Sequence, residues 1–338
     1  MVQGDTLSLT GDYLKYDGDA QIAQARKNVH LKHRGTLLVT DSLNYDKLYD
    51  LGYFFDGGKL YDGKNTLVSD WGEYSPQTRE AVFNYHVKLT NERFTLTSDT
   101  LHYNTLTKIT HIVGPSNINS DGNRIYTERG YYDTAKDYAE LFDRSVVING
   151  KSTMTGDSMY YDKKNGKMHA YNNIVYNDKG NKNLLTGDYC EYDDTTGYAM
   201  ATKNAVVRDY SSPDTLFMHA DTFKIFTYNI RTDSVYRLVH GYHKARAFRS
   251  DVQSVCDSLK YDSKNKKMTM YGNPIVWNNN QQLLGEEIQV FMCDSTIDSV
   301  HVIRQALLAQ QLDSACYNQV AGREMYAYFN GGKLSWSK

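Results

Sequence analysis

Apolar and polar residues alternate along most of the chain, and this period of two predicts half-buried β-strands. The alternation is clearest after a recurring acidic residue. The second and fourth residues beyond it are mostly apolar or aromatic, and the residue between them is mostly polar, as in TSDTLHYN at 97–104. Turn residues such as Asp17-Gly18 follow, and then a second strand such as HVKL at 86–89. Only 300–312 is ambiguous, either a short helix or a strand pair with a turn.

The acidic residue marks an internal repeat. The first five intervals between markers are each 29 residues, and the later ones are 31, 33, 36, 29 and 38. Propeller blades are longer than this, and helical repeats of similar length lack the period of two. We therefore expect about ten stacked β-units, with insertions in the later copies. The markers are Asp12, Asp41, Asp70, Asp99, Glu128, Asp157, Asp188, Asp221, Asp257, Glu286 and Glu324.

A single unit is too small to fold alone. Its roughly four inward apolar side chains contribute on the order of 6–12 kcal/mol when buried, whereas ordering 29 residues costs roughly 30 kcal/mol or more. Stacking is thus required, as an extended jelly roll or a solenoid. We expect one continuous array over 4–330, with two tandem sub-arrays, 4–156 and 157–330, as an alternative, and a carboxyl-terminal tail at 331–338.

Composition narrows the function classes. The 40 Asp and Glu against 38 Lys and Arg give a net charge of −2, which argues against a nucleic-acid partner. No apolar run reaches 18 residues, and residues 1–5 show no secretory signal. The four cysteines form no CxxC pair, so they are either small buried hydrophobes or, in an oxidising compartment, one or two disulfides; they are Cys190, Cys256, Cys293 and Cys316.

The sequence offers no catalytic constellation. GxSxG, HExxH, P-loop and GxGxxG motifs are missing, and the ten histidines are scattered. We expect no enzyme activity, no cofactor and no metal. The marker acids form either a ladder of ligands or, as we favour, acceptors for backbone N–H groups at bends between strands.

Two sets of residues are candidates for binding. The inward apolar positions of the repeat either form plain core or line a groove; they are Leu14, Tyr16, Leu43, Tyr45, Leu101, Tyr103, Met159, Tyr161, Phe223, Ile225, Leu259, Tyr261, Ile288 and Val290. Two basic segments either lie on solvated strand faces or contact phosphate; their candidates are Lys32, Arg34, Lys244 and Arg246.

The repeated unit resembles the OstA/LptA family of periplasmic lipopolysaccharide-transport proteins. Strings such as LVTDSLNYD at 38–46 and LTGDYCEYD at 185–193 carry the resemblance, which extends from about residue 4 to 330. The richness in Tyr and Asn resembles an OstA-like protein of a Bacteroidetes-type Gram-negative bacterium. The resemblance implies an elongated, twisted antiparallel β-jelly roll, folded like a V, with a groove that holds acyl chains.

The same resemblance implies a function. The expected protein is a periplasmic, possibly outer-membrane-associated carrier of lipopolysaccharide or lipid A between the two membranes. It would join other Lpt-type β-jelly-roll proteins, or itself, end to end through open sheet edges. The alternatives are a structural or adhesive β-solenoid without a lipid groove and a carbohydrate-active β-helix enzyme. The last would need one layer where acids and bases converge, and the sequence shows none.

Overall fold

The computed structural model describes residues 2–3, 7–120, 122–211, 214–230, 232–250, 252–278, 280–293, 296–330 and 333–338. All regular elements of these residues are β-strands, and their pairings are antiparallel, as expected. The ambiguous window is a strand, since 300–311 lies in β30 (Thr296–Gln311). No described segment forms a helix that is long and apolar enough to cross a membrane.

The chain divides into two compact units. Unit 1 comprises Met1–Gly150 and Thr155–Asn165, and unit 2 comprises Lys151–Met154 and Gly166–Lys338. Whether the repeat array is continuous or in tandem sub-arrays stays a prediction. The strands of unit 1 are β1 (Val2–Gln3), β2 (Leu7–Thr10), β3 (Tyr13–Asp17), β4 (Ile22–His33), β5 (Thr36–Asp46), β6 (Leu51–Phe54), β7 (Gly58–Asp62), β8 (Asn65–Ser69), β9 (Trp71–Tyr74), β10 (Glu80–Thr90), β11 (Thr95–Asn104), β12 (Ile109–Ser120), β13 (Asn123–Asp133) and β14 (Tyr138–Asn149).

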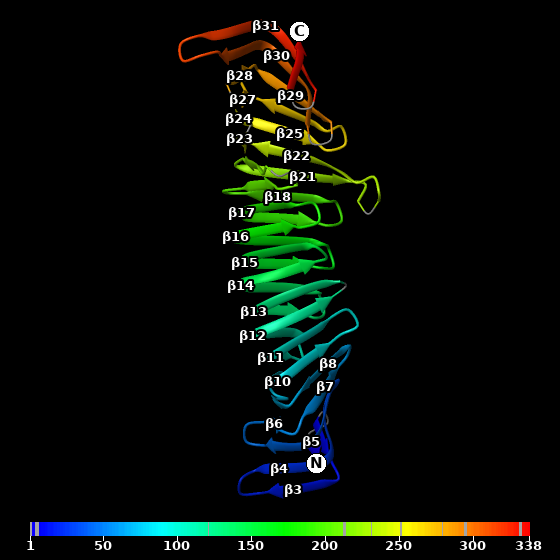
Figure 1. Cartoon of the computed structure of the whole chain (residues 1–338). Coiled ribbons are helices and arrows are strands. Elements are labelled where there is room, and N and C mark those ends of the chain that lie inside the picture. Colours follow the sequence, from blue (N-terminus) through cyan, green and yellow to red (C-terminus); the bar gives the residue numbers. More distant parts are fainter. Residues whose placement is uncertain are drawn as a thin grey trace. The chain divides into compact units, whose positions relative to one another are not determined.

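The 29-residue period corresponds to two long strands and their turns. β10, β11, β12, β13 and β14 each span 10–12 residues and pair with the next strand along the chain (Figure 1). Because a strand and its successor run out and back, every second strand carries a copy of the acidic marker. The repeat in the sequence is therefore a hairpin repeat in the structure.

The long strands bend at bulges, where the register between neighbouring strands shifts. In β10 the register with β11 shifts between Asn84 and Val87, and the two residues between them, Tyr85 and His86, have φ of 65° and 52°. Adjacent positive-φ pairs recur at 27–28, 143–144, 172–173, 203–204, 243–244 and 304–305. An extra residue pair of this kind bends a strand sharply. We call each hairpin of the repeat a layer. The bend divides every layer into two halves.

We call the segment after the marker, with the Leu-x-Tyr pattern, the Tyr half of a layer, and the segment before it the Val half. In β5 these are 42–46 and 36–40, which pair with β6 and β7 respectively. The two halves pack face to face in unit 1, since a Cβ on Gly52 of the Tyr half would lie 3.1 Å from Leu31 Cδ2 of the Val half. The enclosed core has side chains with 0% exposure from both halves: Leu43, Phe54, Phe83, Leu101 and Ile112, and Leu60, Leu67, Leu89 and Leu96.

Unit 2 has the same plan with shorter strands and longer connections. One strand, β15 (Ser152–Asp162), contributes residues to both units. The others are β16 (Lys167–Asp178), β17 (Asn183–Asp193), β18 (Tyr198–Thr202), β19 (Val206–Asp209), β20 (Leu216–His219), β21 (Thr222–Tyr228), β22 (Tyr236–Tyr242), β23 (Ala245–Arg249), β24 (Val252–Cys256), β25 (Ser258–Asp262), β26 (Lys267–Tyr271), β27 (Ile275–Asn278), β28 (Gln281–Leu284), β29 (Glu287–Cys293), β30, β31 (Tyr317–Asn330) and β32 (Lys333–Ser337). In the predicted tail, β32 pairs with β31.

Candidate functional site

Four buried tyrosines line the side of the unit 1 interior opposite the bend. Tyr45, Tyr74, Tyr103 and Tyr132 follow one another at intervals of 29 residues and are 0–4% exposed. The Tyr103 hydroxyl donates to Asp62 Oδ2 at 2.8 Å, and the Tyr132 hydroxyl donates to Asp137 at 2.5 Å. Burial first, and then the neighbouring carboxylate, raises the pKa of both phenols. They therefore stay protonated and act as donors.

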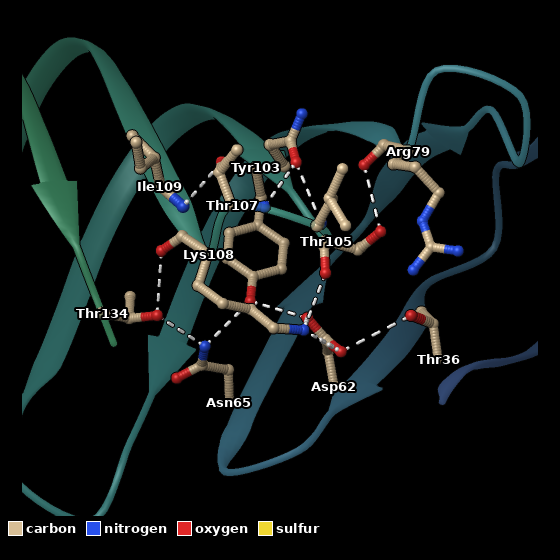
Figure 2. A network of polar contacts seen from close by, with 12 residues as sticks. Thr36, Asp62, Asn65, Arg79, Tyr103, Thr105, Thr107, Lys108, Ile109 and Thr134 are labelled. Carbon is tan, nitrogen blue, oxygen red and sulfur yellow. Dashed lines mark hydrogen bonds and ion pairs between the residues drawn. The ribbon is translucent and has the colours of Figure 1, made fainter. Parts of the chain in front are cut away.

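The strongest cluster surrounds Asp62, at the end of β7 in the Val half (Figure 2). Its side chain is 4% exposed and accepts from Lys108 Nζ at 2.5 and 2.6 Å. Asn65 donates to the Tyr103 hydroxyl at 2.8 Å and to Thr134 Oγ1 at 2.7 Å. A buried carboxylate needs such partners, because leaving it unpaired costs several kcal/mol.

This cluster joins the two halves of the unit. Asp62 and Asn65 flank a turn of the Val half, whereas Lys108 and Thr134 lie in turns of the Tyr half. A second ion pair joins the two halves in the next layer, where Arg93 Nη1 lies 3.0 Å from Asp137 Oδ2. We call this line the mouth of unit 1, where the Val-half turns face the Tyr-half turns. Its polar bonds hold the mouth shut over a packed apolar core.

The inward positions expected in unit 1 are core rather than an open groove. Leu43, Tyr45, Leu101, Tyr103 and Met159 are all 0–1% exposed, and Tyr161 is half-buried.

Leu14 and Tyr16 differ from the expectation of inward burial. They are 46% and 51% exposed, because β3 is an edge strand whose described pairing is with β4 alone. Among the described strands, none pairs with the other edge of β3.

In unit 2 the inner face of the Tyr half has two rows that differ in burial. The row near the bend is buried in every described strand, and its members pair directly across the sheet: Cys190, Ala201, Phe223, Gly241, Leu259, Met270, Ile288, Val302 and Met325. The next row outward is apolar but mostly half-buried. Its members are Ala199, Ile225, Val239, Tyr261, Met268, Val290, Val300 and Ala327, of which only Val300 is fully buried.

The Val half of unit 2 presents a similar row. Its cross-strand neighbours are apolar or small and, apart from Ser254 at 9% exposure, half-buried: Leu185, Val207, Met218, Ala247, Ser254, Val276, Leu283 and Leu308. We call this row and the outer Tyr-half row together the inner rows of unit 2. Of the expected groove residues, Phe223, Leu259 and Ile288 are thus core, while Ile225, Tyr261 and Val290 lie in the inner rows.

The two halves of unit 2 meet near the bend, where a Cβ on Gly241 of the Tyr half would lie 3.4 Å from Cβ of Ala220, which follows β20 of the Val half. Further out, burial first, and then the charge of Asp209 on β19 of the Val half, raises the pKa of the Tyr261 phenol on β25 of the Tyr half. The inner rows therefore form two opposed apolar surfaces that still reach water. Such surfaces can bury the methylene groups of a ligand, each worth about 0.8 kcal/mol.

The marker acids lie at the bends and bind residues of the bulges. Asn28 Nδ2 donates to Asp12 at 2.8 Å, and Asn204 Nδ2 donates to Asp188 at 2.7 Å. The backbone N–H of Asn28 also donates to Asp41, at 3.2 Å. These bonds tie the left-handed bulge residues to the acids. The bond from the Asn28 backbone N–H to Asp41 is of the type that we expected, whereas Asp12 and Asp188 accept from side chains; for the remaining markers the expectation stays a prediction.

The basic candidates are divided between the two units. Lys32 and Arg34 lie in unit 1, whereas Lys244 and Arg246 lie in unit 2, and all four are exposed. Lys244 is one of the left-handed bulge residues, and Arg34 lies in a turn with φ of 53°. Their contact with phosphate stays a prediction.

The four cysteines form no disulfide with one another. Cys190 and Cys256 are buried, as expected of small hydrophobes, whereas Cys293 and Cys316 are exposed. Burial raises the pKa of Cys190 to about 12 and that of Cys256 to about 11, which keeps both thiols protonated and unreactive. The described residues contain no group of three or more His, Cys, Asp or Glu placed to hold a metal ion.

Sequence reasoning missed the polar mouth of unit 1. Asp62, Asn65 and Lys108 lie in turns, where polar residues are ordinarily solvated. One signal was present, because Tyr45, Tyr74, Tyr103 and Tyr132 recur with the period of the repeat, and a buried phenol needs a partner at its tip.

Comparison with known proteins gives a match to a family model and matches to solved structures. A family model described as OstA-like protein matches residues 1–99. The crystal structure of LptH from Pseudomonas aeruginosa, titled the LptA homologous periplasmic component of the conserved lipopolysaccharide transport device, is 15% identical with a TM-score of 0.29. It covers 31% of this chain and 79% of its own. No curated protein matches the sequence. The chain is therefore an all-β protein that is OstA-like over its first 99 residues.

Proposed function

We propose that the protein carries the acyl chains of an amphiphile, lipopolysaccharide or lipid A, between the inner rows of unit 2. The observation that carries the proposal is the change in burial between the units. Four residues beyond their markers, Tyr45 and Tyr103 of unit 1 are 0–1% exposed, whereas Ile225 and Val290 of unit 2, at the same place in the repeat, remain half-buried on an apolar face. Apolar surface that stays in contact with water is costly unless a ligand covers it.

The expected affinity follows from the methylene groups buried. About ten methylenes at about 0.8 kcal/mol each give on the order of 8 kcal/mol, which corresponds to a Kd near 1 μM before ordering costs. The OstA-like match over 1–99 supports an Lpt-type bridge in the periplasm as the setting. The exposed edge strand β3, with Leu14 and Tyr16, supports end-to-end pairing with another such protein or a second copy.

The closed interior of unit 1 favours a different role for that unit. Its core is packed and its mouth is bridged by Asp62–Lys108 and Arg93–Asp137. We propose that unit 1 acts as a rigid β-solenoid, as in the structural alternative, and that lipid binding is confined to unit 2.

A charge placed in the inner rows tests the proposal. Val239 belongs to the inner rows, and its neighbour Leu238 on the same strand points to the opposite face. Val239→Asp should abolish binding of a lipid A–type amphiphile, measured by native mass spectrometry of the full chain, while Leu238→Asp should retain it. Equal binding by the two folded variants, or no binding by the unmodified chain, would refute the proposal.

A further inference from the structure

An arginine at the mouth of unit 1 has a fixed backbone and an unsatisfied side chain. Arg79 lies in the turn between β9 and β10 with φ of 66°. Its N–H donates to the Ser75 carbonyl at 2.9 Å, and its carbonyl accepts from Thr105 N at 2.8 Å and Thr105 Oγ1 at 3.1 Å. These three bonds hold a left-handed conformation that is uncommon for a residue other than glycine. The guanidinium lies on the side of this turn where Thr36 is found (Figure 2).

The guanidinium is charged at every physiological pH and has five N–H donors. Two of its nitrogens, Nε and Nη1, are covered from solvent and have no hydrogen-bond partner among the described residues. The residue as a whole is half-buried, so it lies at the mouth and not deep in the core. A buried donor without a partner is rare in native proteins and calls for a ligand, an ion or a water.

The nearby carboxylates are already bound to other groups. Asp62 accepts from Lys108 and Tyr103, and Asp50 accepts from the Tyr45 hydroxyl. Asp137, one layer on, pairs with Arg93. The positive charge of Arg79 is therefore not offset by an ion pair of its own.

The other groups around Arg79 are hydrogen-bonding and neutral. The Tyr74 hydroxyl lies 2.9 Å from His33 Nδ1, and both side chains are buried. Burial first, and then the charges of Arg79 and Arg34, lowers the pKa of His33. Thr36 Oγ1 reaches Asp62 only at 3.5 Å, a weak bond, and Thr36 also interacts with the Tyr74 hydroxyl, so the two hydroxyls lie together beside Arg79.

We infer that Arg79, with the hydroxyls of Thr36 and Tyr74 beside it, forms an oxyanion site that takes a phosphate group at the mouth of unit 1. The planar guanidinium matches the paired oxygens of a phosphate. Binding needs a rotation of the Arg79 side chain that turns its covered nitrogens toward the mouth. The phosphate is either inorganic phosphate or the head group of a phosphorylated amphiphile. The site is independent of the acyl-binding rows of unit 2.

The test is the unfolding of the full chain in phosphate-free buffer and with added inorganic phosphate at constant ionic strength. A ligand that binds the folded state multiplies the folding equilibrium constant by about 100 at 100 times its Kd. The unmodified chain should be stabilised by phosphate and not by chloride. Arg79→Met should lose this increment, and in phosphate-free buffer it should be no less stable than the unmodified chain, because it removes an unpaired charge. Arg79→Lys should weaken the increment, since it keeps the charge without the planar donors.

Arg93→Met is the matched control at the same mouth. It leaves Asp137 unpaired, so it should be destabilised in both buffers while keeping the phosphate increment. A short-chain phosphorylated amphiphile, compared with the same amphiphile lacking phosphate, separates the two sources. If the phosphorylated amphiphile stabilises the chain at a lower concentration than inorganic phosphate does, and Arg79→Met loses this effect, the ligand is a head group. If both stabilise at equal concentrations, the ligand is the free ion. The site is refuted if phosphate does not stabilise the unmodified chain, or if Arg79→Met retains the increment.

Discussion

Replacing Lys108 by Met should destabilise unit 1 far more than the same change at an exposed ion pair. Lys108 Nζ lies 2.5 Å from Asp62, whose side chain is 4% exposed. Removing one partner of a buried pair costs about 3–5 kcal/mol because the remaining charge stays buried. Since Lys108 itself is 32% exposed, we expect the lower end, about 3 kcal/mol. In Lys64–Glu92 the side chains are 68% and 66% exposed, and Lys64→Met should cost about 0.5 kcal/mol or less.

Urea unfolding followed by tryptophan fluorescence measures the difference. The chain has three tryptophans, of which Trp71 lies in unit 1, so a background with Trp277→Phe and Trp336→Phe reports on unit 1 alone. With a slope of about 2 kcal/mol/M, Lys108→Met should lower the urea midpoint by about 1.5 M and Lys64→Met by about 0.3 M or less. Adding Asp62→Asn to Lys108→Met should restore part of the loss, because it removes the unpaired charge. Equal midpoints for Lys108→Met and Lys64→Met would refute the polar closure of the mouth.

Three further outcomes follow from single sites. In the native chain, thiol labelling quantified by mass spectrometry should spare Cys190, whose pKa burial raises to about 12, and modify the exposed cysteines; labelling of Cys190 at the same rate would contradict its burial. The hydrogen bond that the His86 ring donates to Asp70 raises the pKa of His86, so the stabilising contribution of this pair is full below the unfolded-state pKa and is lost as pH rises through the folded-state pKa. NMR titration should show this pKa return to its ordinary value in Asp70→Asn, and an unchanged pKa would exclude the pair. Gly130→Ala should lower the denaturation midpoint, since its Cβ would lie 2.4 Å from the Glu140 carbonyl oxygen, whereas Gly35→Ala, with no atom within 4 Å, should be near neutral; equal midpoints would contradict the close approach.

The sequence predicted the layers of the fold well, because a period of two in side-chain direction is a local property. The residues two and four beyond each acidic marker do share one face, as Leu43 and Tyr45 show, and the 29-residue interval is one hairpin. The bends were also foreseen as places where the acids act, although the left-handed bulges that they bind were not. The family resemblance correctly indicated an all-β antiparallel structure.

What the sequence could not predict is which parts of the interior close. Closure of unit 1 depends on bonds between residues far apart in the chain, such as Asn65 with Thr134, 69 residues away, and Tyr103 with Asp62, 41 residues away. The period of the sequence pattern carries no information about such distant pairs. It also assigned Leu14 and Tyr16 the same environment as their repeats, although an edge strand lacks the neighbour that would bury them.

The contrast between a packed unit 1 and an accessible unit 2 interior is tested most directly by photo-methionine, an isosteric photocrosslinker, incorporated at the ten methionines. Met218 and Met268 belong to the inner rows of unit 2, whereas Met159 lies in unit 1 and is 1% exposed. After irradiation with an acylated lipid, peptide mass spectrometry should place lipid adducts on Met218 and Met268 and none on Met159. Adducts concentrated on Met159, or confined to the outward-facing Met200, would contradict the account.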